Sequence, residues 1–289
     1  MGRERAAARR LRFGCALSAL VVVVLGASAS ARAWRRTTVD GDPSRPLVWR
    51  SSTISMRLAA HTVRDLDPEQ ARQAVRAAMA TWEGPCCSDL RLRLAGDSTS
   101  RETSVTGAFD DENTIFVRDD VAGDPWPPAP IVSPGALAVT TVIYRTSSGE
   151  ILEVDLDVNA VTHTLSLDAA PSGSVATDLQ GVLTHELGHV IGLAHSDVTD
   201  AVMIAGVPAG ELWRRELEED DVAGVCEVHP APAGACDASP DGGLDTGRRH
   251  VTGCDCKAAP GASDRANVLA WLAAVLVATF AARRRGTTD

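Results

Sequence analysis

The feature that most constrains this chain is the run THELGHVIGLAHS at positions 184–196, in which three histidines fall within eleven positions. His185 and His189 stand four residues apart, and the apolar residues around them recur with a helical period. On a helix, this spacing places both imidazoles on one face and one turn apart, where each can give a nitrogen to a single metal ion. The pattern therefore predicts a metal site carried by a helix.

A third ligand cannot lie on the same helix, so the chain has to turn. Gly192 stands where a turn with positive φ is easiest, and His195 follows three residues later. Three histidines leave the fourth ligand position open, which is the arrangement of a catalytic zinc. Glu186 directly follows the first histidine, and from there its carboxylate can act as a general base on water at the metal. The stretch predicts one zinc ion held by His185, His189 and His195.

The sequence HELGHVIGLAH resembles the zinc signature of the metzincin metalloproteases. The residues after it are similar to those of one branch of that group. Ser196 directly follows the third histidine, and Met203 stands eight positions past that histidine. Both features are similar to the matrixin branch, in which a methionine turn lies beneath the zinc. The resemblance implies that Met203 makes a floor under the ligands and is not itself a ligand.

The resemblance also implies an α+β fold of the zincin-like metzincin type, with a twisted, mixed five-stranded sheet and three helices across residues 47–230. Residues 135–138 (GALA) are similar to the matrixin edge strand above the cleft, and residues 217–225 (LEEDDVAGV) are similar to its closing helix. A peptide or protein substrate would lie extended beside the edge strand, near Leu137 and Ala138. The implied activity is that of a zinc endopeptidase.

The apolar pattern along the chain indicates the same mixture of strands and helices. Alternating residues predict strands at 53–59, 90–94, 114–117, 136–144 and 151–158, and the last two form a hairpin. Helical periodicity predicts helices at about 68–83, 178–192 and 217–226. Asp67 is the predicted cap of the first helix, and Thr177 is the predicted cap of the second.

Several polar residues are predicted to face solvent. Asp155 and Asp157 alternate with apolar residues on the last strand. Four acids at 218–221 suit a helix N-terminus and are interpreted as a solvated helix start. Three histidines have no partner by spacing and are predicted to lie on the surface: His61, His229 and His250.

The acidic residues also bear on possible partners. The formal net charge of −10 argues against nucleic acid, since phosphate binding needs a basic surface. The run at 110–112, with Asp119, Asp120 and Asp124, leaves calcium binding open as an alternative. Because the run lacks an ordered ligand spacing, a solvated loop is the preferred interpretation.

The chain is expected to be a monomer.

Two properties of matrixins are not expected here. No cysteine lies between Trp34 and Cys86, so latency through a propeptide cysteine is not predicted. Only His163 lies in the region that would hold a second, structural zinc, so that site is not predicted either. Two other functions stay open: a catalytically silent, zinc-stabilised surface binding or adhesion module, and a zinc hydrolase of non-peptide amides. Glu186 argues against the binding module, because a structural site needs no base and usually has four protein ligands.

Both ends of the chain indicate export. Residues 1–33 combine arginines, an apolar run and small-residue cleavage sites, which predicts a signal peptide, with an uncleaved anchor as the alternative. A short segment, 34–46, precedes the domain. Residues 231–265 form a linker rich in Pro, Gly and Asp, and 266–285 form an apolar segment ending in arginines, which predicts a transmembrane helix. With Cys254-Asp-Cys256, this tail resembles the sorting tails of myxobacterial surface proteins. An extracellular or cell-surface location is therefore expected, with the tail anchored or processed.

Export would place the cysteines that remain after signal removal in an oxidising environment, where disulfides form. Six cysteines allow fifteen pairings, and the sequence does not choose among them. These residues are Cys86, Cys87, Cys226, Cys236, Cys254 and Cys256.

Overall fold

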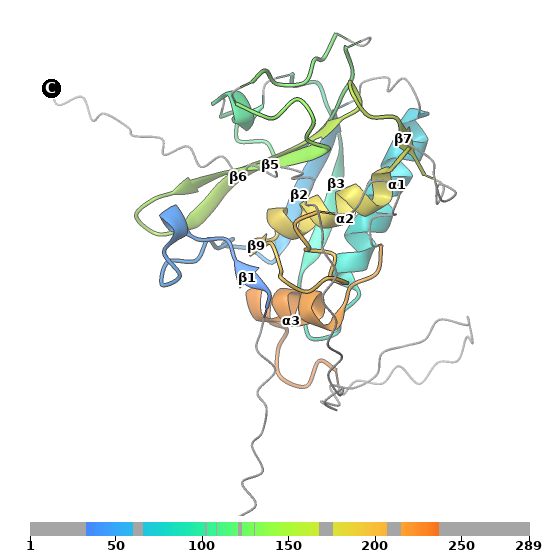
Figure 1. Ribbon diagram of the computed structural model, residues 1–289. Helices are drawn as coiled ribbons and strands as arrows, with labels where there is room; N and C mark the ends of the chain where they lie inside the picture. Colours follow the sequence, from blue (N-terminus) through green and yellow to red (C-terminus); the bar gives the residue numbers. More distant parts are fainter. Residues whose placement is uncertain are drawn as a thin grey trace, which may run out of the picture. The chain divides into compact units, whose positions relative to one another are not determined.

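The main sheet has five strands in the computed structural model, which describes residues 33–59, 66–101, 103–107, 109–120, 123–129, 131–167, 176–206 and 215–236. In spatial order the strands are β3 (Arg91–Ser98), β2 (Thr53–Ala59), β4 (Thr114–Arg118), β6 (Glu150–Asn159) and β5 (Ala138–Arg145). The first four strands are parallel, and β5 runs antiparallel to β6 at one edge (Figure 1). The predicted mixed, five-stranded sheet is therefore confirmed.

Outside the main sheet, the chain also forms two two-stranded sheets and two short 3-10 helices. The strand β1 (Arg35–Arg36) pairs with β9 (Leu193–Ala194), and β7 (Leu165–Ser166) pairs with β8 (Thr177–Asp178). The 3-10 helices are η1 (Val39–Gly41) and η2 (Ser104–Thr106). The β1–β9 pair matters for the site, because β9 lies between the second and third histidines of the motif.

The three predicted helices are present as α1 (Pro68–Glu83), α2 (Leu179–Val190) and α3 (Glu219–Val228). Figure 1 shows α2 beside α1, crossing in front of β2 and β3, with α3 near the lower end of α1. Trp82 of α1 is fully buried, and its indole Nε1 donates to the backbone oxygen of Thr184 of α2 at 2.7 Å. The helix that carries the histidines is thus fixed by the apolar face of α1.

One of the two predicted helix caps is correct. The Asp67 side chain accepts from the backbone N–H of Glu69, as expected of a cap on α1. For α2 the cap is Asp178 and not Thr177, because Asp178 accepts from the backbone N–H of Gln180 at 3.1 Å. Thr177 lies one residue before this cap.

The acids of β6 are buried, so the prediction that Asp155 and Asp157 face solvent is wrong. Each has at most 2% of its surface exposed. The segment containing η2 covers this face of the sheet: Ser104 donates through its N–H and its hydroxyl to Asp155, both at 2.8 Å, and Thr103 donates to Asp157 at 2.8 Å. Burial raises the pKa of Asp155 to about 7. Strand alternation separates two faces, but it does not tell which face a distant loop will cover.

Other predicted surface residues are also buried. Asp119 and Asp124 are at most 4% exposed, and Asp124 pairs with the buried Arg118, so the solvated-loop interpretation is wrong for these two acids. Calcium binding by this segment stays an untested alternative. His229 is 5% exposed and its Nε2 lies 3.0 Å from the backbone oxygen of Ile191, because the end of α3 closes over the end of α2. His61 and His250 lie outside the described residues.

Two disulfides join the end of α1 to the C-terminal part of the domain. Cys87 pairs with Cys226 of α3, and Cys86 pairs with Cys236 beyond it. The Cα–Cα distance is 5.2 Å in both pairs, which is within the usual range for a disulfide. The expectation of disulfides is confirmed for these four cysteines, and the structure supplies the pairing that the sequence left open.

The predicted signal peptide, most of the linker and the apolar C-terminal segment lie outside the described residues, as do Cys254 and Cys256. Within the described residues, no helix combines the length and the apolar character that crossing a membrane requires.

Candidate metal centre

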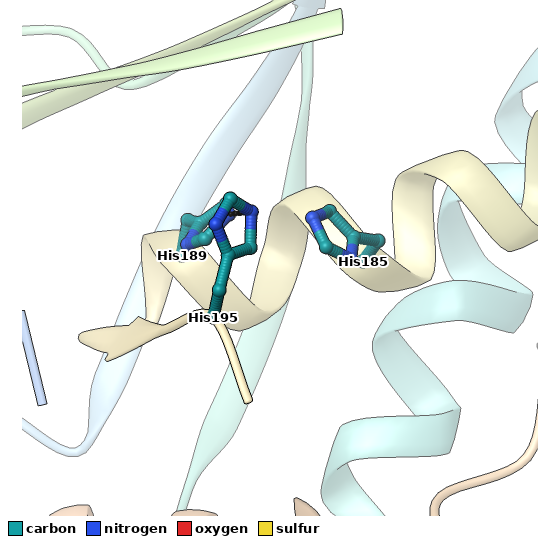
Figure 2. A group of neighbouring side chains, drawn as sticks. All are labelled: His185, His189 and His195. Carbon is teal, nitrogen blue, oxygen red and sulfur yellow. Dashed lines mark hydrogen bonds between the residues drawn. The ribbon is translucent and has the colours of Figure 1, made fainter. Parts of the chain in front are cut away.

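Three histidines from two segments of the chain meet at one point, as predicted. His185 and His189 project from α2, and His195 lies just after β9 (Figure 2). Their ring centroids are 4.8 to 5.3 Å apart, and one nitrogen from each ring lies within 4.8 Å of the other two. Gly192 has φ of +105°, so the glycine adopts the left-handed conformation that the turn between helix and third histidine requires.

The backbone around the site orients the two helical rings. Nδ1 of His185 lies 2.7 Å from the backbone oxygen of Val202, and Nδ1 of His189 lies 2.8 Å from that of Leu193. A ring whose Nδ1–H donates to a carbonyl keeps its lone pair on Nε2, so both rings offer Nε2 to an ion. Nε2 of His189 lies 3.2 Å from Nε2 of His195, about the separation of two nitrogens that each lie about 2 Å from one zinc ion.

The electrostatics of the site also suit a metal ion. Burial lowers the pKa of His185 to about 4, lowers that of His189 well below its usual value, and lowers that of His195 as well. All three imidazoles are therefore neutral near pH 7, which is the form that binds a metal. Three neutral nitrogen donors that converge in a buried site fit a zinc ion with one open coordination position.

A methionine turn lies beneath the histidine-bearing helix. Met203 is 1% exposed, and its backbone oxygen accepts from the N–H of Ser196 at 2.7 Å, which ties this turn to the segment after His195. Gly188 allows the close approach, because a β-carbon at Gly188 would lie 2.1 Å from Sδ of Met203 and 2.8 Å from Cζ2 of Trp82. Met203 thus packs against the histidine-bearing helix at Gly188, and its role as a floor under the ligands stays a prediction.

The Gly188→Ala variant tests this approach. We expect it to lower the free energy of unfolding by about 1–3 kcal/mol, because Met203 and the rigid ring of Trp82 have to move to admit a methyl group. Chemical denaturation of the variant and the wild type measures the change. The substitution Gly135→Ala is the matched control, since an added β-carbon at Gly135 meets no atom within 4 Å. Equal losses in the two variants would contradict the packing argument.

The turn is held from α3 by Asp221, one of the four acids predicted to form a solvated helix start. Asp221 has no exposed surface, so that interpretation is wrong for this residue. Its carboxylate accepts from the backbone N–H groups of Val202 at 2.7 Å, Met203 at 3.1 Å and Glu218 at 3.0 Å. The sequence shows Asp221 only as an acid near the start of a helix. Which backbone N–H groups donate to its carboxylate depends on the tertiary fold.

Glu186 is buried beside the first ligand. It is 2% exposed, and Oε2 accepts a hydrogen bond from the hydroxyl of Thr140 at 2.6 Å. Burial raises the pKa of Glu186 to about 7, which is the range in which a carboxylate can both accept and return a proton near neutral pH. Thr140 carries no signal for this role in the sequence, because no local pattern links it to a residue 46 positions later.

The two predicted substrate-contacting residues lie at the start of the edge strand. Ala138 is the first residue of β5, and Leu137 directly precedes it, with its backbone oxygen accepting from Asn159 N–H at 2.9 Å. In the main sheet, β5 pairs with β6 on one side and is the last strand in the order. Ala138 thus lies in the edge strand, whereas Leu137, also predicted to lie in that strand, directly precedes it. Substrate binding at these two residues stays a prediction.

The sheet, the histidine-bearing helix and the turn beneath it together define a domain of the metzincin type, with three histidines that could hold one metal ion. Comparison with known families leads to the same class. The family model of the matrixins (Peptidase_M10) matches residues 48–230, and the chain belongs to this family of zinc enzymes.

Several curated relatives are similar to the chain. Metalloendoproteinase 1-MMP of Arabidopsis thaliana is 40% identical over 194 residues, which cover 67% of this chain and 46% of the relative. Stromelysin-1 of Mus musculus is 26% identical over 206 residues, covering 71% and 36%. Macrophage metalloelastase of Oryctolagus cuniculus is 24% identical over 190 residues, covering 66% and 35%. The chain thus matches less than half the length of these relatives.

Proposed function

We propose that this protein is an exported zinc endopeptidase. The observation that carries the proposal is the meeting of three neutral histidine nitrogens with a buried carboxylate, Glu186, next to an edge strand. A relative that is 40% identical over most of the domain is named a metalloendoproteinase, which supports the same activity.

Three histidines and Glu186 would have different roles in peptide-bond hydrolysis. His185, His189 and His195 would hold the zinc, which when bound would supply a Lewis acid for the scissile carbonyl and make nearby water more acidic. Glu186 would accept a proton from the attacking water and pass it to the nitrogen of the leaving amine as the C–N bond breaks. The raised pKa of Glu186 suits both directions of transfer.

The edge strand would orient the substrate. An extended peptide can pair with the open side of β5 as an added strand, so backbone hydrogen bonds would hold it near Leu137 and Ala138. Such pairing would recognise the peptide backbone and would bring a scissile bond near the histidines, which supports peptides and proteins over other amides as the proposed substrates.

A zinc-stabilised binding module is the second candidate, and the site disfavours it. A structural zinc usually has four protein ligands and needs no base. Here a group of three histidines is the metal-binding set found within the described residues, and a buried carboxylate lies beside it.

We also propose export, followed by display at the cell surface. The support is the sequence of the two ends: a basic and apolar segment at 1–33, and an apolar segment with terminal arginines at 266–285. The two disulfides are consistent with an oxidising compartment.

Metal removal tests the proposed activity. We expect the purified protein to bind one zinc per chain and to cleave unfolded protein substrates. A chelator should stop cleavage, and added zinc should restore it. Elemental analysis gives the zinc content, and mass spectrometry of the products identifies the cleaved bonds. Full zinc occupancy without cleavage of any peptide or protein would favour the binding module.

A further inference from the structure

The hydrogen bond between Thr140 and Glu186 links the edge strand directly to the carboxylate beside the histidines. Oγ1 of Thr140 donates to Oε2 of Glu186 at 2.6 Å, and it lies 3.4 Å from the backbone oxygen of the same residue. Thr140 has no exposed surface and Glu186 is 2% exposed. A hydrogen bond to a carboxylate that is shielded from water is stronger than a bond between neutral groups.

The alternation of β5 fixes the direction of the threonine side chain. Ala138 and Val142, two residues to either side, lie in the main core with the helices, whereas the intervening Val139 packs in a separate cluster. Thr140 therefore faces α2, and a hydroxyl at this position can reach Glu186. Thr141 has its side chain on the opposite face of the strand.

We propose that Thr140 is a positioning residue for Glu186 in peptide-bond hydrolysis, an inference that rests on the proposed function. The hydroxyl holds Oε2, so Oε1 faces the reacting groups. As the water oxygen bonds to the carbonyl carbon, its proton passes to Oε1. The proton then passes to the amine nitrogen as the C–N bond breaks, and the threonine keeps its own proton throughout.

Removing the hydroxyl leaves the carboxylate free to rotate about its last torsion, because sp³–sp² torsions are broad. Orientations in which neither oxygen meets the reacting water then become populated. Substrate pairing with the backbone of β5 does not involve the hydroxyl. The loss should therefore appear in kcat, with KM unchanged.

Three variants separate positioning from general structural effects. Thr140→Val removes the hydroxyl at constant shape and Thr140→Ser retains it. Thr141→Val is the matched control, since Thr141 is equally buried and its hydroxyl makes no hydrogen bond among the described residues. We expect Thr140→Val to lower kcat about tenfold to hundredfold, with KM within about twofold, as for one lost bond to a charged group. The kcat of Thr140→Ser should stay within about threefold of the wild-type kcat. The kcat of Thr141→Val should equal that of the wild type.

Zinc content and thermal unfolding provide readouts that do not depend on activity. All variants should bind one zinc. When Glu186 is present, Thr140→Val should lower Tm by a few degrees more than the same substitution does in a Glu186→Ala protein. The reason is that the hydrogen bond from Thr140 exists only when Glu186 is present.

An unchanged kcat in Thr140→Val overturns the proposal, and so does a Thr140→Ser variant as slow as Thr140→Val. If the zinc-loaded wild type cleaves nothing although the Tm difference is present, the proposed function fails and the catalytic role of Thr140 fails with it. If the wild type cleaves and the Thr140→Val effects are absent, the positioning role alone fails.

Discussion

Replacing Glu186 by alanine is expected to lower kcat/KM for peptide cleavage by about a hundredfold to ten-thousandfold while one zinc stays bound per chain. The carboxylate lies beside the histidines without belonging to the set that could hold the metal. Its removal would therefore take away the group proposed to accept and return the proton, and the three histidines would remain. Steady-state assays on an unfolded protein substrate, together with elemental analysis, measure both quantities.

The control for this variant is Glu219→Ala, which removes a carboxylate of the same length from an exposed position at the start of α3. It should match the wild type in both zinc content and rate. A Glu186→Ala protein that holds zinc and cleaves at the wild-type rate would show that Glu186 is not the base. Loss of zinc together with activity would instead assign Glu186 to metal binding.

The second large effect is expected for Asp221→Ala, which removes the carboxylate that ties α3 to the methionine turn. Three backbone N–H groups would lose their acceptor in a buried site, and each such donor costs about 1–3 kcal/mol. We expect the free energy of unfolding to fall by about 3–5 kcal/mol, since mutations of this kind reach the upper end of the observed range. Chemical denaturation measures the loss.

The same variant should also bind zinc more weakly, by about tenfold to hundredfold. Asp221 accepts from the N–H of Met203, and the carbonyl oxygen of the same peptide unit, that of Val202, contacts Nδ1 of His185, so the carboxylate orients a metal ligand through one peptide unit. Competition with a chromophoric chelator measures the affinity. Glu219→Ala again serves as the control, with a stability change within about 0.5 kcal/mol. Wild-type stability and zinc affinity in Asp221→Ala would contradict this role.

The sequence by itself determined the local parts of this protein. Histidines four residues apart on a helix must share a face, and Gly192 permits the turn to His195, so spacing alone predicted the metal set that the structure brings together. The five strands and three helices followed from apolar periodicity for the same reason. Each depends on neighbours within a few positions, and the ends agree within two residues except at β3, which continues to Ser98 where the prediction ended at residue 94.

Tertiary structure decided which distant residues meet. Alternation on β6 did not reveal that a loop near Ser104 would bury Asp155, and a run of acids did not reveal that Asp221 would bind the methionine turn. The disulfides join cysteines 139 and 150 positions apart, and the hydrogen bond from Thr140 spans 46 positions. Hydrogen bonds and disulfides act over a few ångströms, so which groups they join depends on the path of the whole chain, and local spacing carries no record of that path.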